Sequence, residues 1–98
     1  MSLRVVFRRA ARHDFEEAAS WYNERRAGLG AEFTSEIDRA LSRASDNPQH
    51  FPIMYRDTRC VRVRRFPYSV FFRAETSRIV VLAVFHARRD PTIWKQRI

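Results

Sequence analysis

Residues 79–91 read IVVLAVFHARRDP, and this stretch determines how the rest of the chain can be arranged. The run from Ile79 to Phe85 is apolar without interruption, which is typical of a central strand covered on both faces. Asp90-Pro91 then provides a helix N-cap and a proline at the first helical position. The stretch therefore predicts a buried strand followed closely by a short C-terminal helix.

Two further strands are predicted upstream of this run. Residues 61–64 alternate valine with arginine, and residues 68–73 show the same period of two. Phe66-Pro67 and residues 75–77 are short enough to be hairpin connections. Residues 47–58 contain Pro48 and Pro52 and are expected to form a loop.

The first half of the chain predicts one strand and two helices. Residues 3–8 alternate as a half-buried strand does, and residues 11–26 carry apolar side chains at helical spacing, with Asp14 as a cap or first-turn residue. Gly28 and Gly30 interrupt this pattern. A second helix follows and should end before Asn47-Pro48; its apolar stripe is Phe33, Ile37, Ala40, Leu41 and Ala44.

These elements predict a single α+β domain over residues 1–98, in the order β-α-α-β-β-β with a short C-terminal helix. We expect a mostly antiparallel sheet of four strands, with the helical hairpin packed on one face. The first strand joins after a crossover, so we expect it to pair in parallel with the last strand. The arginines of the second half would then lie on the other face.

The net charge of +8 comes entirely from the second half of the chain. Residues 1–50 hold eight Lys/Arg and eight Asp/Glu, whereas residues 51–98 hold eleven and three. A cationic face of this kind favours contact with a polyanion or an acidic partner. Cys60 is the single cysteine, which fits a reducing cytoplasm, and the sequence has no apolar stretch of ~20 residues that could span a membrane.

Three groups of residues are candidates for function. Arg62 and Arg64 should project from the outer face with Arg73, where guanidinium groups bind phosphates or carboxylates; an ordinary solvated sheet face is the alternative. His86 could transfer protons or simply end its strand. In the Trp21-Tyr22 pair, Tyr22 should lie on the core stripe, and Trp21 beside it is either core or an anchor for a partner.

The sequence offers no metal or cofactor site. His13 and His50 lack metal-ligand spacing, and Cys60 has no Cys-x-x-Cys partner, so we interpret Cys60 as a small strand hydrophobe. Three acidic residues in the second half are too few for two-metal nuclease chemistry. Any phosphodiester chemistry would therefore have to be metal-free.

In this order the residues resemble the RelE/ParE family of small toxins from bacterial type II toxin–antitoxin modules. The resemblance covers nearly the whole chain, and the ordered set is more specific than any one piece. The matching pieces are Asp14-Phe15-Glu16-Glu17-Ala18, Trp21-Tyr22, Gly28-Leu29-Gly30, Asn47-Pro48, Arg65-Phe66-Pro67-Tyr68 and the ending from Val81 to Pro91 with Trp94. The family implies the fold given above and a co-expressed antitoxin that wraps and neutralises the toxin.

The family divides into ribosome-dependent ribonucleases that cut mRNA without metal and ParE-like proteins that poison DNA gyrase. With Tyr68 aligned to the tyrosine that opens the third strand, Arg62 and Arg88 fill two ribonuclease positions. The other three positions hold Cys60, Ser69 and Trp94. An indole is not an acid or base, and a serine supplies no cation, so this pattern weighs against RNA cleavage. A shift of two residues would bring Arg64 into the site, and His86 could serve as a substitute base.

The resemblance therefore favours the ParE-like branch: a toxin that inhibits DNA gyrase by protein contact, without catalytic residues or cofactors, and is neutralised by a ParD-like antitoxin. The expected target-binding residues are Arg88, Arg89, Trp94, Lys95 and Arg97. The expected antitoxin-binding residues are Trp21, Phe33, Ile37, Arg59, Arg62, Arg64 and Phe71.

The alternative is a RelE-like, ribosome-dependent mRNA endonuclease acting without metal. Its site would comprise Arg62, Arg64, Arg73, His86 and Arg88. A third hypothesis is a family member that has lost its toxicity.

Overall fold

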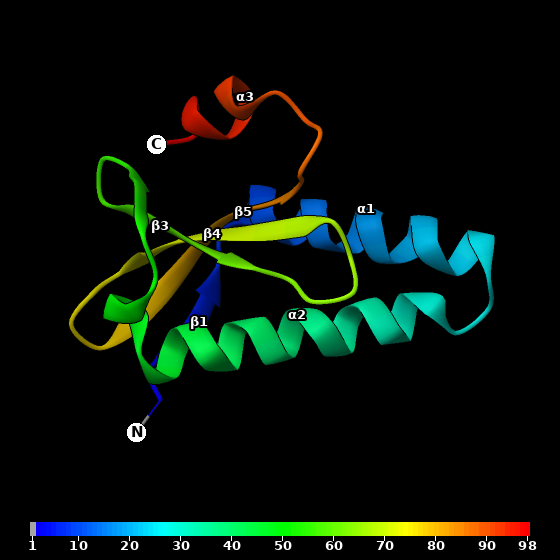
Figure 1. Ribbon diagram of the computed structural model, residues 1–98, viewed down its shortest axis with the longest axis horizontal. Coiled ribbons are helices and arrows are strands. Elements are labelled where there is room, and N and C mark those ends of the chain that lie inside the picture. The colour runs from blue at the N-terminus through cyan, green and yellow to red at the C-terminus, as the bar shows by residue number, and fades with distance from the viewer. Residues whose placement is uncertain (1) are drawn as a thin grey trace.

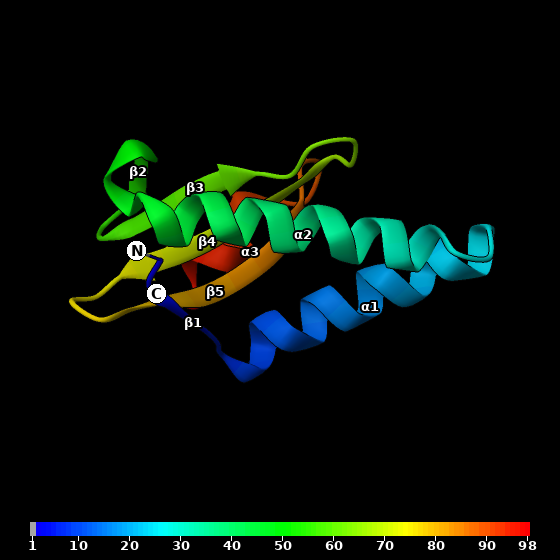
Figure 2. The same ribbon diagram turned by 90° about the horizontal axis from the view of Figure 1, so that it is seen from below.

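The computed structural model describes residues 2–98 as a single sheet between two helical layers (Figure 1). The elements in chain order are β1 (Arg4–Phe7), α1 (Arg9–Arg25), α2 (Leu29–Asp46), a 3-10 turn (Pro48–His50), β2 (Ile53–Tyr55), β3 (Thr58–Arg62), β4 (Tyr68–Ala74), β5 (Arg78–His86) and α3 (Pro91–Lys95). The long helices α1 and α2 lie on one side of the sheet, and α3 lies on the other, as Figure 2 shows. None of the helices in residues 2–98 is long and apolar enough to cross a membrane.

The sheet has the strand order β1-β5-β4-β3-β2. β1 pairs in parallel with β5, Val5 opposite Ile79, and the other neighbouring strands are antiparallel. The predicted parallel pairing of the first and last strands is therefore confirmed. The interior of β5 is buried on both faces: Val81 and Val84 belong to the core under the long helices, and Ala83 and Phe85 belong to a second cluster.

The predicted number of four strands is wrong, because part of the expected loop 47–58 is a fifth strand. Ile53–Tyr55 forms β2 and pairs with β3 across a tight turn at Arg56-Asp57. The sequence does not predict this strand, because it has only three residues, follows Pro52 and shows no alternation of apolar and polar side chains. β3 also differs from the expected 61–64, since it begins at Thr58 and ends at Arg62.

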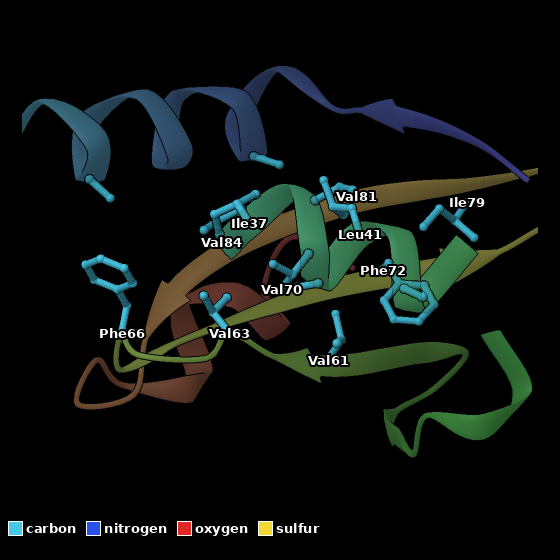
Figure 3. Close-up of a cluster of buried hydrophobic side chains, with 14 of the residues drawn as sticks. Ile37, Leu41, Val61, Val63, Phe66, Val70, Phe72, Ile79, Val81 and Val84 are labelled. Carbon is cyan, nitrogen blue, oxygen red and sulfur yellow. The ribbon is translucent and has the colours of Figure 1, made fainter. Parts of the chain in front are cut away.

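The main core lies between the long helices and the sheet. Phe33 of α2 is at its centre, with ring centroids 5.2 Å from both Tyr22 and Phe66 and 5.1 Å from Tyr68. Figure 3 shows that Ile37 of α2 also points into this cluster. The expected stripe of the second helix is thus confirmed as its buried face.

The turn between the helices depends on two glycines with different roles. Gly28 has φ +91°, a conformation that favours glycine, and its N–H donates to Oδ1 of Asn23 at 2.9 Å. Gly30 lies inside α2, where an added Cβ would meet the carbonyl oxygen of Ala19 at 2.6 Å. Gly28 therefore ends the first helical pattern as expected, whereas Gly30 lets the two helices approach closely.

A small second cluster fixes α3 to the outer face of the sheet. The Trp94 ring stacks on Phe71 with centroids 4.0 Å apart and packs with Phe85. Asp90 caps α3 by accepting from the N–H of Thr92 at 3.0 Å, with Pro91 in the first turn, as predicted. The prediction for Asp14 is wrong, because this residue lies inside α1, which begins at Arg9, and its side chain caps no helix.

Candidate macromolecule-binding surface

A hollow of about 340 Å³ opens on the outer face of the sheet beside α3. It runs from the edge strand β2 to the end of β5, and its lining residues are Met54, Cys60, Arg62, Ser69, Phe71, Phe85, His86, Ala87, Arg89, Pro91 and Trp94. We call it the outer hollow. Its lining includes two exposed arginines and no carboxylate, so it favours anionic groups.

The floor of the outer hollow holds Cys60, whose sulfur is not set up as a nucleophile. Burial raises the pKa of the Cys60 thiol, against smaller opposing effects of a hydrogen bond with Ser69 and the charge of Arg62. A raised pKa keeps the group in its protonated, unreactive form near neutral pH. The interpretation of Cys60 as a strand hydrophobe agrees with its contact with the Trp94 cluster.

His86 lies at the rim of the outer hollow, at the end of β5. Its Nδ1 accepts a hydrogen bond from the backbone N–H of Arg88 at 3.0 Å. This hydrogen bond engages the lone pair of Nδ1 and ties the ring to the backbone that follows β5. The geometry therefore gives His86 a role in holding the turn after β5. Its ring also packs against Tyr68, with the two ring centroids 5.2 Å apart.

The five residues of the ribonuclease alternative do not come together. Arg62 and His86 line the outer hollow, whereas Arg64 lines a separate hollow on the α2 side with Arg43. Burial, and secondarily the charge of Arg64, lower the pKa of Arg43, which shows that the two cations are close. The expectation that Arg64 shares a face with Arg62 is wrong, because β3 ends at Arg62 and the chain then turns.

Arg73 is separated from the other candidates as well, and the Arg88 side chain does not line the outer hollow. Arg73 lies at the far end of β4, opposite Thr58 and Val80, and its guanidinium pairs with Glu75 at 3.1 Å. Arg88 is exposed in the turn after β5 and does not line the outer hollow.

The residues expected to contact a target fall into two groups. Arg88 and Arg89 are exposed, and Lys95 is half-buried with its Nζ 5.4 Å from the Tyr55 ring. Trp94, by contrast, is 5 % exposed and fills the second cluster, so its ring has little surface for a partner. Arg97 pairs with Asp14 inside the molecule, its Nη1 2.6 Å from Oδ2.

The residues expected to bind an antitoxin divide in the same way. Trp21 is 49 % exposed, with the Arg25 guanidinium 3.9 Å from its ring, and Arg62 and Arg64 are exposed. Arg59 is half-buried and donates to the carbonyl oxygen of Phe51 at 2.7 Å. Two of the expected contacts, Phe33 and Ile37, are corrected by their burial in the core, where a partner does not reach them, whereas the largely buried Phe71 lines the outer hollow.

A second hollow of about 290 Å³ lies between α1 and the ends of β4 and β5. Its residues are Asp14, Glu17, Ala18, Trp21, Tyr22, Tyr68, Val84, His86 and Arg89. Burial raises the pKa values of Tyr22 and Tyr68, so both phenols stay protonated near neutral pH. The exposed Trp21 therefore lines a partly polar hollow, which is a suitable position for a side chain that anchors a partner.

Sequence reasoning missed two features of this surface. The pairing of Asp14 with Arg97 spans 83 positions, and no local pattern indicates it. The exposed edge strand β2 lies within the expected loop, and its one signal in the sequence is the row of three apolar residues at 53–55. In the part of the chain that the structure describes, no group of three His, Cys, Asp or Glu side chains could hold a metal ion.

The fold is a small α+β domain, and the outer hollow on its sheet has a cationic lining without a carboxylate. The family model described as ParE toxin of the type II toxin–antitoxin system parDE matches residues 5–91, and the chain therefore belongs to this family of toxins. The resemblance to RelE/ParE toxins noted in the sequence is confirmed. No curated protein sequence matches the chain significantly.

Solved structures with this fold include two toxin–antitoxin assemblies. The chain superposes on a chain of the chromosomal ParDE system from P. aeruginosa with a TM-score of 0.74 and 16% identity, covering 87% of this chain and 96% of that one. For the RelBE2 complex from Mycobacterium tuberculosis the TM-score is 0.61 and the identity 21%, covering 88% and 99%. Both likenesses establish the fold.

Proposed function

We propose that the protein is a ParE-like toxin that inhibits DNA gyrase by direct binding and is held inactive by a cognate antitoxin in the cytoplasm. Membership of the ParE toxin family supports the first part. The observation that carries the choice of a binding mechanism is the state of His86, whose Nδ1 already accepts from the Arg88 backbone. This hydrogen bond engages the one imidazole that lines the outer hollow, which supports binding over phosphodiester cleavage.

The exposed cations near the C-terminal end of β5 are the proposed contacts for the target. Arg88 and Arg89 are exposed, and Lys95 continues this surface from α3. Trp94 and Arg97 act indirectly, by fixing α3 to the sheet and to α1. Trp21, Arg62 and Arg64 are the exposed residues that remain for the antitoxin.

A gyrase supercoiling assay with the purified toxin tests this function. We expect inhibition by the wild-type protein, and at least about tenfold weaker inhibition by Arg88→Glu, because a rim charge that meets an acidic surface changes sign. Arg9→Glu is the matched control, since Arg9 is an exposed arginine at the start of α1 that does not line the outer hollow. Gyrase activity that is unaffected by the wild-type toxin would contradict the proposal.

An mRNA endonuclease remains the second candidate, because the outer hollow combines Arg62 and Arg89 without any carboxylate. Such a site suits a phosphate backbone. Primer extension on cellular mRNA after toxin induction separates the two functions: codon-linked cuts would indicate the nuclease, and gyrase cleavage complexes would indicate the poison. Normal growth without the antitoxin would instead identify a family member without toxicity.

A further inference from the structure

The connection between β3 and β4 runs beside α2 (Figure 1), and two side-chain contacts hold it there. Nη2 of Arg43 donates to the carbonyl oxygen of Arg62 at 2.9 Å, and Arg65 pairs with Glu32 at 2.6 Å. Arg64 lies between these two positions in the chain, is exposed, and lines a hollow of about 370 Å³. We call it the α2 hollow.

All the side chains that line the α2 hollow are polar or charged. They are Asp38, Arg39, Ser42, Arg43 and Arg64. Arg39 and Arg43 are four positions apart on α2, so they are neighbours on the helix surface, and Arg64 joins them from the connection. The hollow therefore brings together three guanidinium groups and one carboxylate, that of Asp38.

Two of these three cations have no acidic partner. Arg39 pairs with Glu36 at 2.9 Å, and Glu36 also lies 3.6 Å from Arg65. Within residues 2–98, no ion pair joins Arg43 or Arg64 to a carboxylate. Burial and the charge of Arg64 lower the pKa of Arg43, against a smaller opposing effect of Glu36. Like charges held this close are unfavourable until an anion lies between them.

The lining favours a phosphate group over an acidic protein segment. One guanidinium is enough to bind a carboxylate bidentately, whereas a phosphate accepts from several donors that approach from different sides. Here two unpaired guanidinium groups from different elements and the Ser42 hydroxyl open onto the same space. Protein segments usually anchor on large hydrophobic side chains. None of the exposed ones in residues 2–98 lines this hollow: Trp21, Ile53, Met54 and Ile93.

We propose that the α2 hollow binds the phosphodiester backbone of a nucleic-acid duplex, with Arg43 and Arg64 donating to one phosphate group. The hollow is open to solvent, so a small free anion would stay largely hydrated there. A duplex instead brings many phosphates to a chain of net charge +8 and releases their counterions. The inference goes beyond the proposed function, and it moves Arg64 from the antitoxin contacts to this site.

Fluorescence anisotropy of a short labelled DNA duplex, titrated with the purified full-length toxin, tests the site. We expect Arg64→Gln to bind about fivefold or more weakly and to lower the salt slope by about one, because one phosphate contact is lost. Arg4→Gln is the matched control, since Arg4 is exposed and does not line the α2 hollow; we expect it to weaken binding less than about twofold. Equal losses would overturn the proposal, because binding would then follow net charge alone.

Arg43 is tested without replacing it, because its hydrogen bond to the connection has a structural role. We expect the Nε–H signals of Arg43 and Arg64 in NMR spectra to shift as the duplex is added, and that of Arg4 to shift less. Inorganic phosphate that saturates these shifts at the same concentration as the duplex would overturn the proposal, since the site would then serve a free anion.

The antitoxin encoded in the adjacent reading frame provides the last comparison. If Arg64→Gln weakens antitoxin binding and leaves duplex binding unchanged, the hollow belongs to an acidic protein segment and the proposal is overturned. The duplex measurements contain neither gyrase nor antitoxin. A toxin that binds the duplex through Arg64 but leaves gyrase unaffected would therefore refute the proposed function and support this site.

Discussion

The ion pair between Asp14 and Arg97 joins the first helix to the C-terminal segment around the edge of β5. Both guanidinium Nη atoms contact the carboxylate, at 2.6 Å and 3.0 Å, and the same carboxylate accepts from the backbone of Val84. The Asp14 side chain is 6 % exposed and the Arg97 side chain 25 %. Replacing Arg97 by glutamine would leave a nearly buried carboxylate without its cation.

The size of the effect follows from this burial. Breaking a fully buried pair by removing one partner costs roughly 3–5 kcal/mol, because the remaining charge is uncompensated. Arg97 keeps some access to solvent and Asp14 keeps the Val84 amide, so we expect Arg97→Gln to lower the free energy of unfolding by about 2 kcal/mol. For a domain of this size the thermal midpoint should fall by roughly 10 °C.

Urea unfolding followed by circular dichroism measures the loss, and a double-mutant cycle assigns it. Asp14→Asn combined with Arg97→Gln should cost less than the sum of the single changes, because the double variant no longer buries a lone charge. Arg26→Gln is the control: it removes the cation of an exposed pair with Glu32, 3.1 Å apart, and should cost less than about 0.5 kcal/mol. If Arg97→Gln costs no more than this control, the burial argument is refuted.

Three further changes test other parts of the fold. Gly30→Ala should destabilise by about 2 kcal/mol in denaturant unfolding, because the new Cβ would meet the Ala19 carbonyl at 2.6 Å; an unchanged midpoint would show that the helices can separate freely. Thr58→Val should raise the free energy of unfolding by about 1 kcal/mol, since within residues 2–98 the buried Thr58 hydroxyl has no hydrogen-bond partner. Thr58→Ser, which keeps the hydroxyl and loses the methyl group, should lower it. A lower stability of the valine variant would mean that the hydroxyl has a hydrogen-bond partner. Hydrogen bonding to Arg65 lowers the pKa of Glu32 from its usual value of 4.5. The ionised Glu32 therefore stabilises the fold at pH values above the pKa that it has in the unfolded chain, and this stabilisation is lost as the pH falls through its lower pKa in the folded protein. Glu32→Gln should therefore flatten the stability profile below about pH 4.5, and an unchanged acid limb would contradict this assignment.

Most of the fold could be predicted because its elements carry their own periodicity. The uninterrupted run 79–85 indicated the central strand, and the stripe through Phe33 and Ile37 indicated the buried face of the second helix. β2 could not be identified in this way. A three-residue strand is held by its neighbour, and here its pairing with β3 and the turn at Arg56-Asp57 exist only in the folded chain.

The site was harder to predict than the fold, because side-chain direction depends on where a strand ends. Arg62 and Arg64 alternate with valine in the sequence, but only Arg62 lies in a strand, and Arg64 turns toward α2. Burial was a second source of error. Trp94 looked like a contact for a partner, yet an aromatic ring next to a small uncovered sheet face packs on it first.

The ion pairs show where the surplus positive charge of the second half lies on the molecule. Four of its eleven cations are in ion pairs within the described chain: Arg65, Arg73, Arg78 and Arg97. Among the others, Arg62 and Arg89 line the outer hollow, and Arg56 and Lys95 flank β2. The surplus is thus concentrated on the face opposite the long helices, next to the exposed apolar edge. Such a face repels copies of itself and attracts acidic chains.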